Sequence, residues 1–260
     1  MQWGDAPRMP NLVLVRHGKT EWSNQNRFAG WADVPLSDAG RTEAQGAGRA
    51  VAVAGLAFDA CFTSFLGRAE ETLSIMRAAL GESTGPTTRA WQLNERHYGA
   101  LQGQNRARAA IEFGNAQVAA WRRSFTAIPP PLADGDPRLP TLDPLYAGIE
   151  HRLLPRTESL ELAADRVAIW WRETLAPRLR AGDNVLVVAH TSSIRGLVRE
   201  IEGLDGAAAA AFRIATAVPL VYRLDDRLET VARETLAADW GGRLRQFVNR
   251  HKPGSLISWV

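Results

Sequence analysis

The sequence predicts an α/β fold with three layers, in which a mostly parallel central sheet is flanked by helices. Two short runs, NLVLV at 11–15 and NVLVVA at 184–189, are apolar and rich in β-branched residues, as strands buried on both faces are. Helix-like segments alternate with such runs along the chain, which favours parallel strands joined by helical crossovers. With 45% hydrophobic residues, the 260-residue chain can bury a full-sized core.

The individual elements follow from their start and stop signals. Ser37 is a suitable N-cap for an Ala-rich helix that stops at Gly55, and Gly81 ends the next helix. The expected helices are 37–54, 68–80, 159–175 and 193–201, with 207–211 a helix or the edge of one. The expected strands are 11–15, 59–64, 184–189, 220–224 and 229–233.

We expect a single domain over residues 1–260. The stretch before Met9 is expected to be an appendage, because the first strand starts directly after Pro10. Prolines cluster over a long irregular segment, about 129–157, and an irregular segment of that length is usually functional. We therefore predict a lid at about 121–157, and residues 237–260 form a tail that matches no recognised pattern.

Bulk composition limits the class of protein. The net charge is +3, too small to indicate nucleic acid and compatible with a small anionic substrate. A single cysteine, Cys61, excludes an intrachain disulfide and cysteine-based metal clusters. No apolar run is long enough for a membrane span, and the N-terminus lacks the apolar region of a secretory signal. We expect a cytoplasmic enzyme without a nucleic-acid or membrane partner, and leave open whether it forms a homo-oligomer.

Two histidines follow strands. Arg16-His17-Gly18 comes after the first strand and His190 after the third, so both should meet at the carboxyl edge of the sheet, where ligands bind. Two imidazoles and a guanidinium suit nucleophilic attack on phosphorus, with the second histidine and the arginine stabilising charge on the oxygens. Gly18 would let the backbone approach a ligand closely. Each histidine alone could be a packed core residue, and a metal site lacks carboxylate and thiolate partners.

The chain resembles a known family along residues 11–236. The stretches that carry this are LVLVRHG at 12–18, GWADVPLS at 30–37, LNERHYGALQG at 93–103, WRRSF at 121–125, IPPPLADGDPRLP at 128–140 and VPLVYRLD at 218–225. They resemble the cofactor-dependent phosphoglycerate mutases of the histidine phosphatase superfamily. The resemblance implies interconversion of 3- and 2-phosphoglycerate in glycolysis and gluconeogenesis. It also implies priming by 2,3-bisphosphoglycerate without a metal.

The same resemblance implies roles for single residues. His17 would carry the phosphoryl group, with Arg16, Arg68 and His190 around it, and Glu95 would be the general acid/base. The implied substrate-binding residues are Thr20, Ser23, Ala29, Gly30, Tyr98, Arg106, Arg122, Arg123, Thr191 and Ser192. Alternatively, Glu95 is a surface partner of Arg96, and Arg122-Arg123 is a solvated face. Trp22 and Trp31 are expected to be core or cleft wall, without a role in the chemistry.

Several outer positions depart from the family's usual residues, and they leave three hypotheses. The differing residues are Lys19, Ser23, Ala29, Arg106, Thr191-Ser192 and Ala215-Thr216-Ala217. The first hypothesis is a phosphoglycerate mutase. The second is the same phosphohistidine chemistry on another phosphorylated acid or sugar, as a mutase or phosphatase. The third is a binding pseudoenzyme, against which the intact His17, Arg68, Glu95 and His190 argue.

Overall fold

A mixed sheet forms the centre of the molecule in a computed structural model that describes residues 9–238 and 244–248. The expected appendage before Met9 and most of the tail lie outside these residues. In this part of the chain the sheet has seven strands in the order β3-β2-β4-β1-β5-β6-β7. The strands are β1 (Asn11–Arg16), β2 (Ala60–Thr63), β3 (Thr87–Arg89), β4 (Val185–Ala189), β5 (Leu220–Leu224), β6 (Thr230–Ala238) and β7 (Leu244–Val248).

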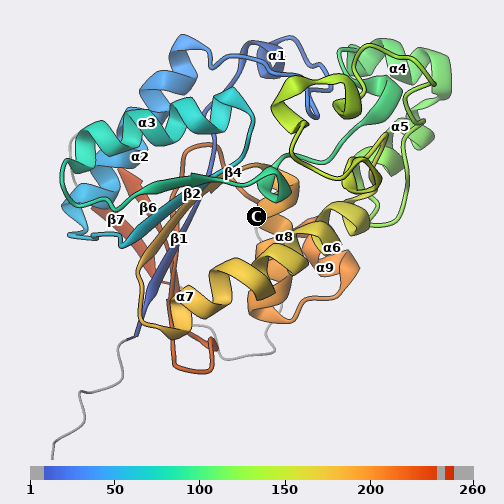
Figure 1. Cartoon of the computed structure of the whole chain (residues 1–260). Helices are drawn as coiled ribbons and strands as arrows, with labels where there is room; N and C mark the ends of the chain where they lie inside the picture. Colours follow the sequence, from blue (N-terminus) through green and yellow to red (C-terminus); the bar gives the residue numbers. More distant parts are fainter. Residues whose placement is uncertain (1–8, 239–243, 249–260) are drawn as a thin grey trace, which may run out of the picture.

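Helices cover both faces of this sheet (Figure 1). The helices are α1 (Glu21–Asn24), α2 (Asp38–Val53), α3 (Gly67–Leu80), α4 (Arg106–Phe113), α5 (Asn115–Arg123), α6 (Leu160–Trp170), α7 (Ala176–Arg180), α8 (Thr191–Glu202) and α9 (Gly206–Ala211). Helices α2 and α3 lie on one side, and α6, α7 and α8 on the other. The predicted three-layer α/β fold is therefore confirmed. No helix in the described ranges is long and apolar enough to cross a membrane.

The first strand shows why its sequence is continuously apolar. Leu12 and Leu14 belong to the core cluster that contains Trp170 of α6 and residues of α8. The alternating residues Val13 and Val15 belong to the cluster on the other face, with residues of α2 and α3. A strand covered on both faces has no solvent side, so the polar alternation of an exposed strand is absent.

Strand pairing brings the two predicted histidines together. Strand β1 pairs in parallel with β4, and Arg16 lies opposite Ala189 in that register. The next residues along these strands are His17 and His190, and the His17 N–H donates to the Ala189 carbonyl at 3.0 Å. Strands β2 and β3 extend the parallel half, whereas β5, β6 and β7 add antiparallel pairs on the other side of β1.

Strands β3 and β7 and helices α1, α4 and α5 were not predicted. Strand β3 is a polar, exposed edge strand, so it lacks the apolar signal of a buried strand. Helix α4 begins at Asn105, whose side chain accepts hydrogen bonds from two backbone N–H groups of the first turn, and Gly114 separates it from α5. The expected lid therefore starts inside a helix, because residues 121–123 are the last turn of α5.

The other expected helices and strands differ from the observed ones mainly in where they begin and end. The helix expected at 159–175 continues through a π-helical turn, Trp171–Leu175, into α7, and the helix expected from 193 already begins at 191. The irregular part of the expected lid contains short 3₁₀ turns at Pro140–Leu142, Pro144–Tyr146 and His151–Leu153. Two further 3₁₀ turns, Trp91–Leu93 and Gly99–Leu101, flank the LNERHYG motif.

Candidate active site

His17 is held as a neutral imidazole at the end of β1. Its side chain is buried, and its Nδ1 lies 2.7 Å from the Gly18 carbonyl oxygen, so Nδ1 carries the proton and Nε2 keeps its lone pair. Burial, followed by the charges of Arg68 and Arg16, holds the pKa of His17 well below its usual range. An unprotonated Nε2 is the form of imidazole that can attack phosphorus.

His190 faces His17 from the end of β4, with ring centroids 4.9 Å apart. Its Nε2 lies 2.7 Å from the Ser64 hydroxyl oxygen, which also accepts the Leu66 N–H at 3.1 Å. When the Ser64 hydroxyl donates to Nε2, the histidine proton lies on Nδ1. This Nδ1 is buried and has no hydrogen-bond partner among the described residues. A buried donor without a partner beside a nucleophile can bind an oxyanion.

Two arginines complete what we call the histidine centre, made of Arg16, His17, Arg68 and His190. The guanidinium of Arg68 donates to the carbonyl oxygens of Gly30 (2.8 Å) and Ala32 (2.9 Å), which fixes its plane. Burial lowers the pKa of Arg68 to about 10, so it remains a cation at neutral pH. The Nε atoms of Arg16 and Arg68 are both buried without a partner in the described residues. The centre therefore offers fixed donors and positive charge to a phosphoryl group.

Gly18 is required for packing. A Cβ at this position would lie 2.3 Å from the Gly40 carbonyl oxygen at the start of α2. The close backbone approach in the structure is therefore to α2, whereas the sequence suggested an approach to a ligand. The Gly18 N–H donates to the Thr72 hydroxyl at 3.2 Å, which fixes the turn after His17.

Glu95 faces the same centre from the loop before the Gly99–Leu101 turn. Its Oε1 accepts the Arg96 N–H at 2.7 Å and the Ser192 N–H at 3.2 Å. Ser192 lies in the first turn of α8, so this carboxylate sits at the positive end of a helix. Its negative charge also opposes the fall in pKa that burial imposes on Arg16 and Arg68. The expected alternative, a surface pairing with the Arg96 side chain, is not what the structure shows.

The outer positions, which are the ten expected substrate contacts, come from loops and helix ends. Thr20 caps α1, Gly30 carries the carbonyl that holds Arg68, and Arg106 starts α4 with its Nε buried and without a described partner. Tyr98 packs against Phe28, and its hydroxyl accepts a hydrogen bond from Arg96 at 2.8 Å. Arg122 and Arg123 end α5 with exposed side chains, Ala29 and Thr191 are half-buried, and Ser192 is buried.

Comparison with known proteins agrees with this geometry. A sequence model of the histidine phosphatase superfamily (branch 1) matches residues 12–137 and 144–235. The chain belongs to the histidine phosphatase superfamily. A 2,3-bisphosphoglycerate-dependent phosphoglycerate mutase of Hamiltonella defensa subsp. Acyrthosiphon pisum (strain 5AT) is 47% identical over 220 residues, which are 85% of this chain and 88% of that protein.

Solved structures of other members share the fold. The alpha-ribazole phosphatase of Shigella flexneri aligns with a TM-score of 0.61 and 20% identity, covering 85% of this chain and 93% of that one. A mycobacterial glucosyl-3-phosphoglycerate phosphatase aligns with a TM-score of 0.58 and 22% identity, covering 92% and 97%. At such low identity these superfamily members support the fold and leave the reaction open.

Several residues that differ from the family's usual residues make contacts outside the histidine centre. The Lys19 ammonium pairs with Glu43 at 2.7 Å, away from the histidine centre. The Ser23 hydroxyl lies 3.2 Å from the Thr20 N–H and 3.0 Å from the Thr20 hydroxyl, as part of the cap of α1. Ala217 has φ +50°, a left-handed conformation that favours glycine, and its N–H donates to the Arg16 carbonyl at 2.8 Å.

Two further arginines were missed by the sequence analysis. Arg96 is 2% exposed, and its Nε and Nη1 have no partner among the described residues. Arg195 lies one turn beyond Ser192 on α8, and its pKa is lowered by burial and raised in part by Glu95 and Tyr98. The i, i+3 spacing from Ser192 could have identified Arg195, because such residues share a helix face. The sequence did not single out Arg96, because a surface pairing with Glu95 was a sufficient explanation for a charged residue at that position.

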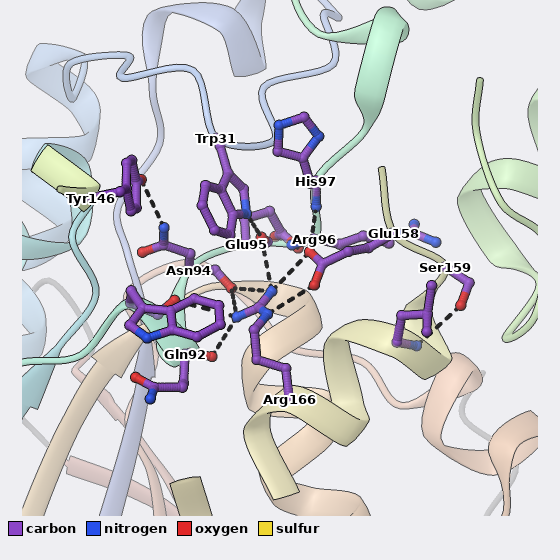
Figure 2. A network of polar contacts seen from close by, with 12 residues as sticks. Trp31, Gln92, Asn94, Glu95, Arg96, His97, Tyr146, Glu158, Ser159 and Arg166 are labelled. Atoms are coloured by element: carbon purple, nitrogen blue, oxygen red, sulfur yellow. Dashed lines mark hydrogen bonds and ion pairs between the residues drawn. The ribbon is translucent and has the colours of Figure 1, made fainter. Parts of the chain in front are cut away.

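A buried network surrounds the backbone of Glu95 (Figure 2). The Trp31 indole N–H donates to the Glu95 carbonyl oxygen at 2.5 Å. Arg166 of α6 forms a bidentate ion pair with Glu158 and donates to carbonyl groups of the 91–95 segment. Trp31 was expected to have no role, and Glu158 and Arg166 were not considered at all, because the partners come from distant parts of the chain.

Within the described residues, no group of three His, Cys, Asp or Glu side chains gathers at metal-binding distance. Arg16 and Arg68 supply positive charge at the histidine centre.

Proposed function

We propose that this superfamily member is a 2,3-bisphosphoglycerate-dependent phosphoglycerate mutase that works through phosphorylated His17 and needs no metal. The observation that carries this proposal is the histidine centre: the ring of a neutral His17 lies 4.9 Å from the ring of His190, beside Arg16 and Arg68, and the buried Nδ1 of His190 has no partner among the described residues. The 47% identical relative that carries this name supports the choice of substrate. Burial lowers the pKa of Arg106, and the positive charge of Arg122 lowers it further; two guanidinium groups that interact in this way suit a second anionic group of the substrate.

The proposed reaction has two phosphoryl transfers. In the first, the hydroxyl oxygen of a phosphoglycerate attacks phosphohistidine at His17, the N–P bond breaks, and Glu95 takes the hydroxyl proton. The resulting bisphosphate then reorients within the site. His17 Nε2 then attacks its other phosphoryl group, the P–O bond breaks, and Glu95 returns the proton to the leaving oxygen. While His17 is phosphorylated, its ring becomes cationic, and the Nδ1–H bond to the Gly18 carbonyl strengthens.

A second candidate is a phosphatase for another phosphorylated acid or sugar. The observation that favours it is the change at the outer positions Ser23, Ala29, Thr191 and Ser192. A mutase must keep the bisphosphate bound while it reorients between the two transfers. If it escapes, water attacks phosphohistidine and inorganic phosphate is released.

The test is to label the protein with [³²P]2,3-bisphosphoglycerate in EDTA and quench at high pH, where phosphohistidine survives. We expect a label that chases into both 2- and 3-phosphoglycerate and is absent from His17→Ala. Turnover in EDTA should equal turnover in added Mg²⁺. A fully active His17→Ala, or activity that depends on one divalent ion, would contradict the mechanism. A label that chases only to inorganic phosphate would favour the phosphatase.

A further inference from the structure

The position of the Glu95 carboxylate depends on how its own backbone is held. The side chain has short reach, and its Oε1 already accepts from the Arg96 and Ser192 N–H groups. A shift of the Glu95 backbone would therefore move the proton-carrying group relative to His17. Loss of alignment by about an ångström can cost roughly 10²-fold in rate.

The Glu95 carbonyl oxygen has two donors from distant parts of the chain. Trp31 Nε1 donates at 2.5 Å, and Arg166 Nη2 approaches at 3.4 Å (Figure 2). Trp31 is 7% exposed and stacks on Tyr146 with ring centroids 5.0 Å apart, so its indole cannot turn away. The donor is therefore fixed by packing before any substrate binds.

Arg166 fixes the rest of the segment that carries Glu95. Its Nη1 donates to the Gln92 carbonyl at 2.5 Å and to the Asn94 carbonyl at 3.3 Å. Its guanidinium is held by Glu158 through bonds of 2.8 and 2.9 Å, and both side chains are less than one-tenth exposed. A planar guanidinium can serve several carbonyl groups and a carboxylate at once, which an ammonium cannot do.

Glu158 holds the other side of the motif. Its Oε2 accepts the His97 N–H at 2.8 Å, and its own N–H donates to the His97 carbonyl at 2.8 Å. The backbone is thus fixed on both sides of Glu95, at residues 92–95 by Arg166 and at residue 97 by Glu158. Breaking a hydrogen-bonded ion pair in a protein interior is strongly unfavourable, so this arrangement is rigid.

We infer that Trp31 and the Glu158–Arg166 ion pair are positioning residues for proton transfer by Glu95. This inference rests on the proposed function, because it assumes that Glu95 moves the proton. It predicts a selective defect. Steps in which a basic alkoxide leaves need a correctly placed acid, whereas a weakly basic aryloxide leaves without a proton.

The test compares Trp31→Phe with the matched control Trp91→Phe. Both indoles lie 5.7 Å from the Arg166 guanidinium, but only that of Trp31 donates to Glu95 among the described contacts. Two readouts are measured: kcat for an alkyl phosphate, 3-phosphoglycerate or glycerol phosphate, and the rate of the p-nitrophenolate burst as His17 is phosphorylated by p-nitrophenyl phosphate. We expect Trp31→Phe to lower the alkyl kcat by about tenfold and to leave the burst rate unchanged. Trp91→Phe should leave both unchanged.

The Glu95→Gln background separates positioning from general structural support. There, Trp31→Phe should have no further effect on the alkyl kcat, because no proton carrier remains to be positioned. An equal loss of both readouts, a tenfold loss that persists in the Glu95→Gln background, or an unchanged Trp31→Phe enzyme would overturn the inference. If the wild-type protein shows no burst from phosphorylation of His17, the proposed function itself is refuted. This outcome is distinct from a failure of the inference, which only the variants can show.

Arg166→Lys is the second variant. It keeps the positive charge but loses the several hydrogen bonds that the guanidinium donates to backbone carbonyl groups and to Glu158. It should show the same split between alkyl turnover and burst, with a lower melting temperature. If it fails to fold, the Trp31 comparison still decides the question. If it folds and lowers both readouts equally, Arg166 acts as general support and the inference is wrong for that residue.

Discussion

The histidine centre and the outer positions differ in how the fold holds them. His17 and His190 follow two adjacent buried strands, and Arg68 lies in the first turn of α3, and all three side chains are less than one-tenth exposed. Most outer positions lie in loops or at helix ends with partly or fully exposed side chains. The centre keeps the residues that the family resemblance implies, whereas five of the ten outer positions differ from the family's usual residues: Ser23, Ala29, Arg106, Thr191 and Ser192. Buried strand ends tolerate little change because their geometry belongs to the core, and loops carry the variation.

The two regions also differ in the kind of group they offer. Guanidinium groups gather around the site, from Arg16 and Arg68 to Arg96, Arg106 and Arg195. The changes remove or divert neutral groups, as at Ala29 and at Ser23, whose hydroxyl belongs to the cap of α1. Charge attracts a substrate with two anionic ends, but directed neutral donors orient it. The structure therefore suggests a site that binds and transfers phosphoryl groups well and orients the bisphosphate weakly.

The largest expected effect comes from the variant Glu95→Gln, which tests the chemistry beside the histidine centre. Glu95→Gln keeps the shape of the side chain and its acceptor oxygen for the Ser192 N–H, but it cannot carry a proton. We expect kcat for 3-phosphoglycerate to fall by roughly 10²–10⁴, the usual contribution of general acid–base catalysis. Steady-state kinetics with a check of the melting temperature measure it. A loss of less than about threefold with chemistry rate-limiting would move the proton carrier elsewhere.

The outer positions are tested by restoring the family's residues. Ser23→Asn, Thr191→Gly and Ser192→Asn together should raise mutase kcat/KM by about tenfold and lower the ratio of phosphate release to mutase turnover. Asn at position 23 can still accept the Thr20 N–H through its amide oxygen. Thr191→Gly costs up to about 1 kcal/mol of stability at the start of α8, so folding is checked by thermal melting. No gain in either quantity would mean that these changes are neutral.

Three buried histidines, His17 and His190 of the centre and His97 outside it, should make stability depend on pH. In the unfolded chain these imidazoles take up protons below about pH 6.5, whereas burial first, then nearby arginines, lowers the pKa of His17, His97 and His190 in the fold. The stability they contribute is present above pH 6.5 and is lost as the pH falls. For His97, whose pKa is lowered to about 3, the loss is roughly 1.4 kcal/mol per pH unit over that window.

Urea unfolding between pH 7.5 and 5.5 measures this slope. His190→Gln should reduce it by about one proton. A free energy of unfolding that does not change with pH would show that the histidines bind protons as readily in the fold as in the unfolded chain, so that burial would not keep His17 neutral below pH 6.5.

The smallest effect concerns Ala217, which lies between the two regions. Its left-handed φ of +50° is unfavourable for alanine. Ala217→Gly should therefore stabilise the protein by up to about 1 kcal/mol, offset in part by the entropy that glycine loses on folding. Chemical denaturation measures it. A destabilised variant would mean that packing of the Ala217 methyl group outweighs its backbone strain.

The strands, the flanking helices and the meeting of His17 with His190 could be predicted because apolar runs and strand ends are local signals. Strand β3 could not, since a polar edge strand has no apolar pattern. Helices α4 and α5 could have been found from Asn105 and Gly114, which lie at their boundaries. The supports of Glu95 could not, because Trp31, Glu158 and Arg166 meet only in the folded chain. The packing of Gly18 against Gly40 could not be predicted for the same reason, because Gly40 lies in another element.

The most direct test of the account is to follow wild-type turnover of 3-phosphoglycerate with 2,3-bisphosphoglycerate in EDTA, counting 2-phosphoglycerate and inorganic phosphate in the same reaction. We predict phosphohistidine-dependent mutase turnover with kcat/KM well below about 10⁶ M⁻¹s⁻¹, accompanied by measurable phosphate release. A kcat/KM near that value with no phosphate released would show that the outer positions orient the bisphosphate as well as the family's usual residues do. The proposed contrast between the two regions would then be wrong.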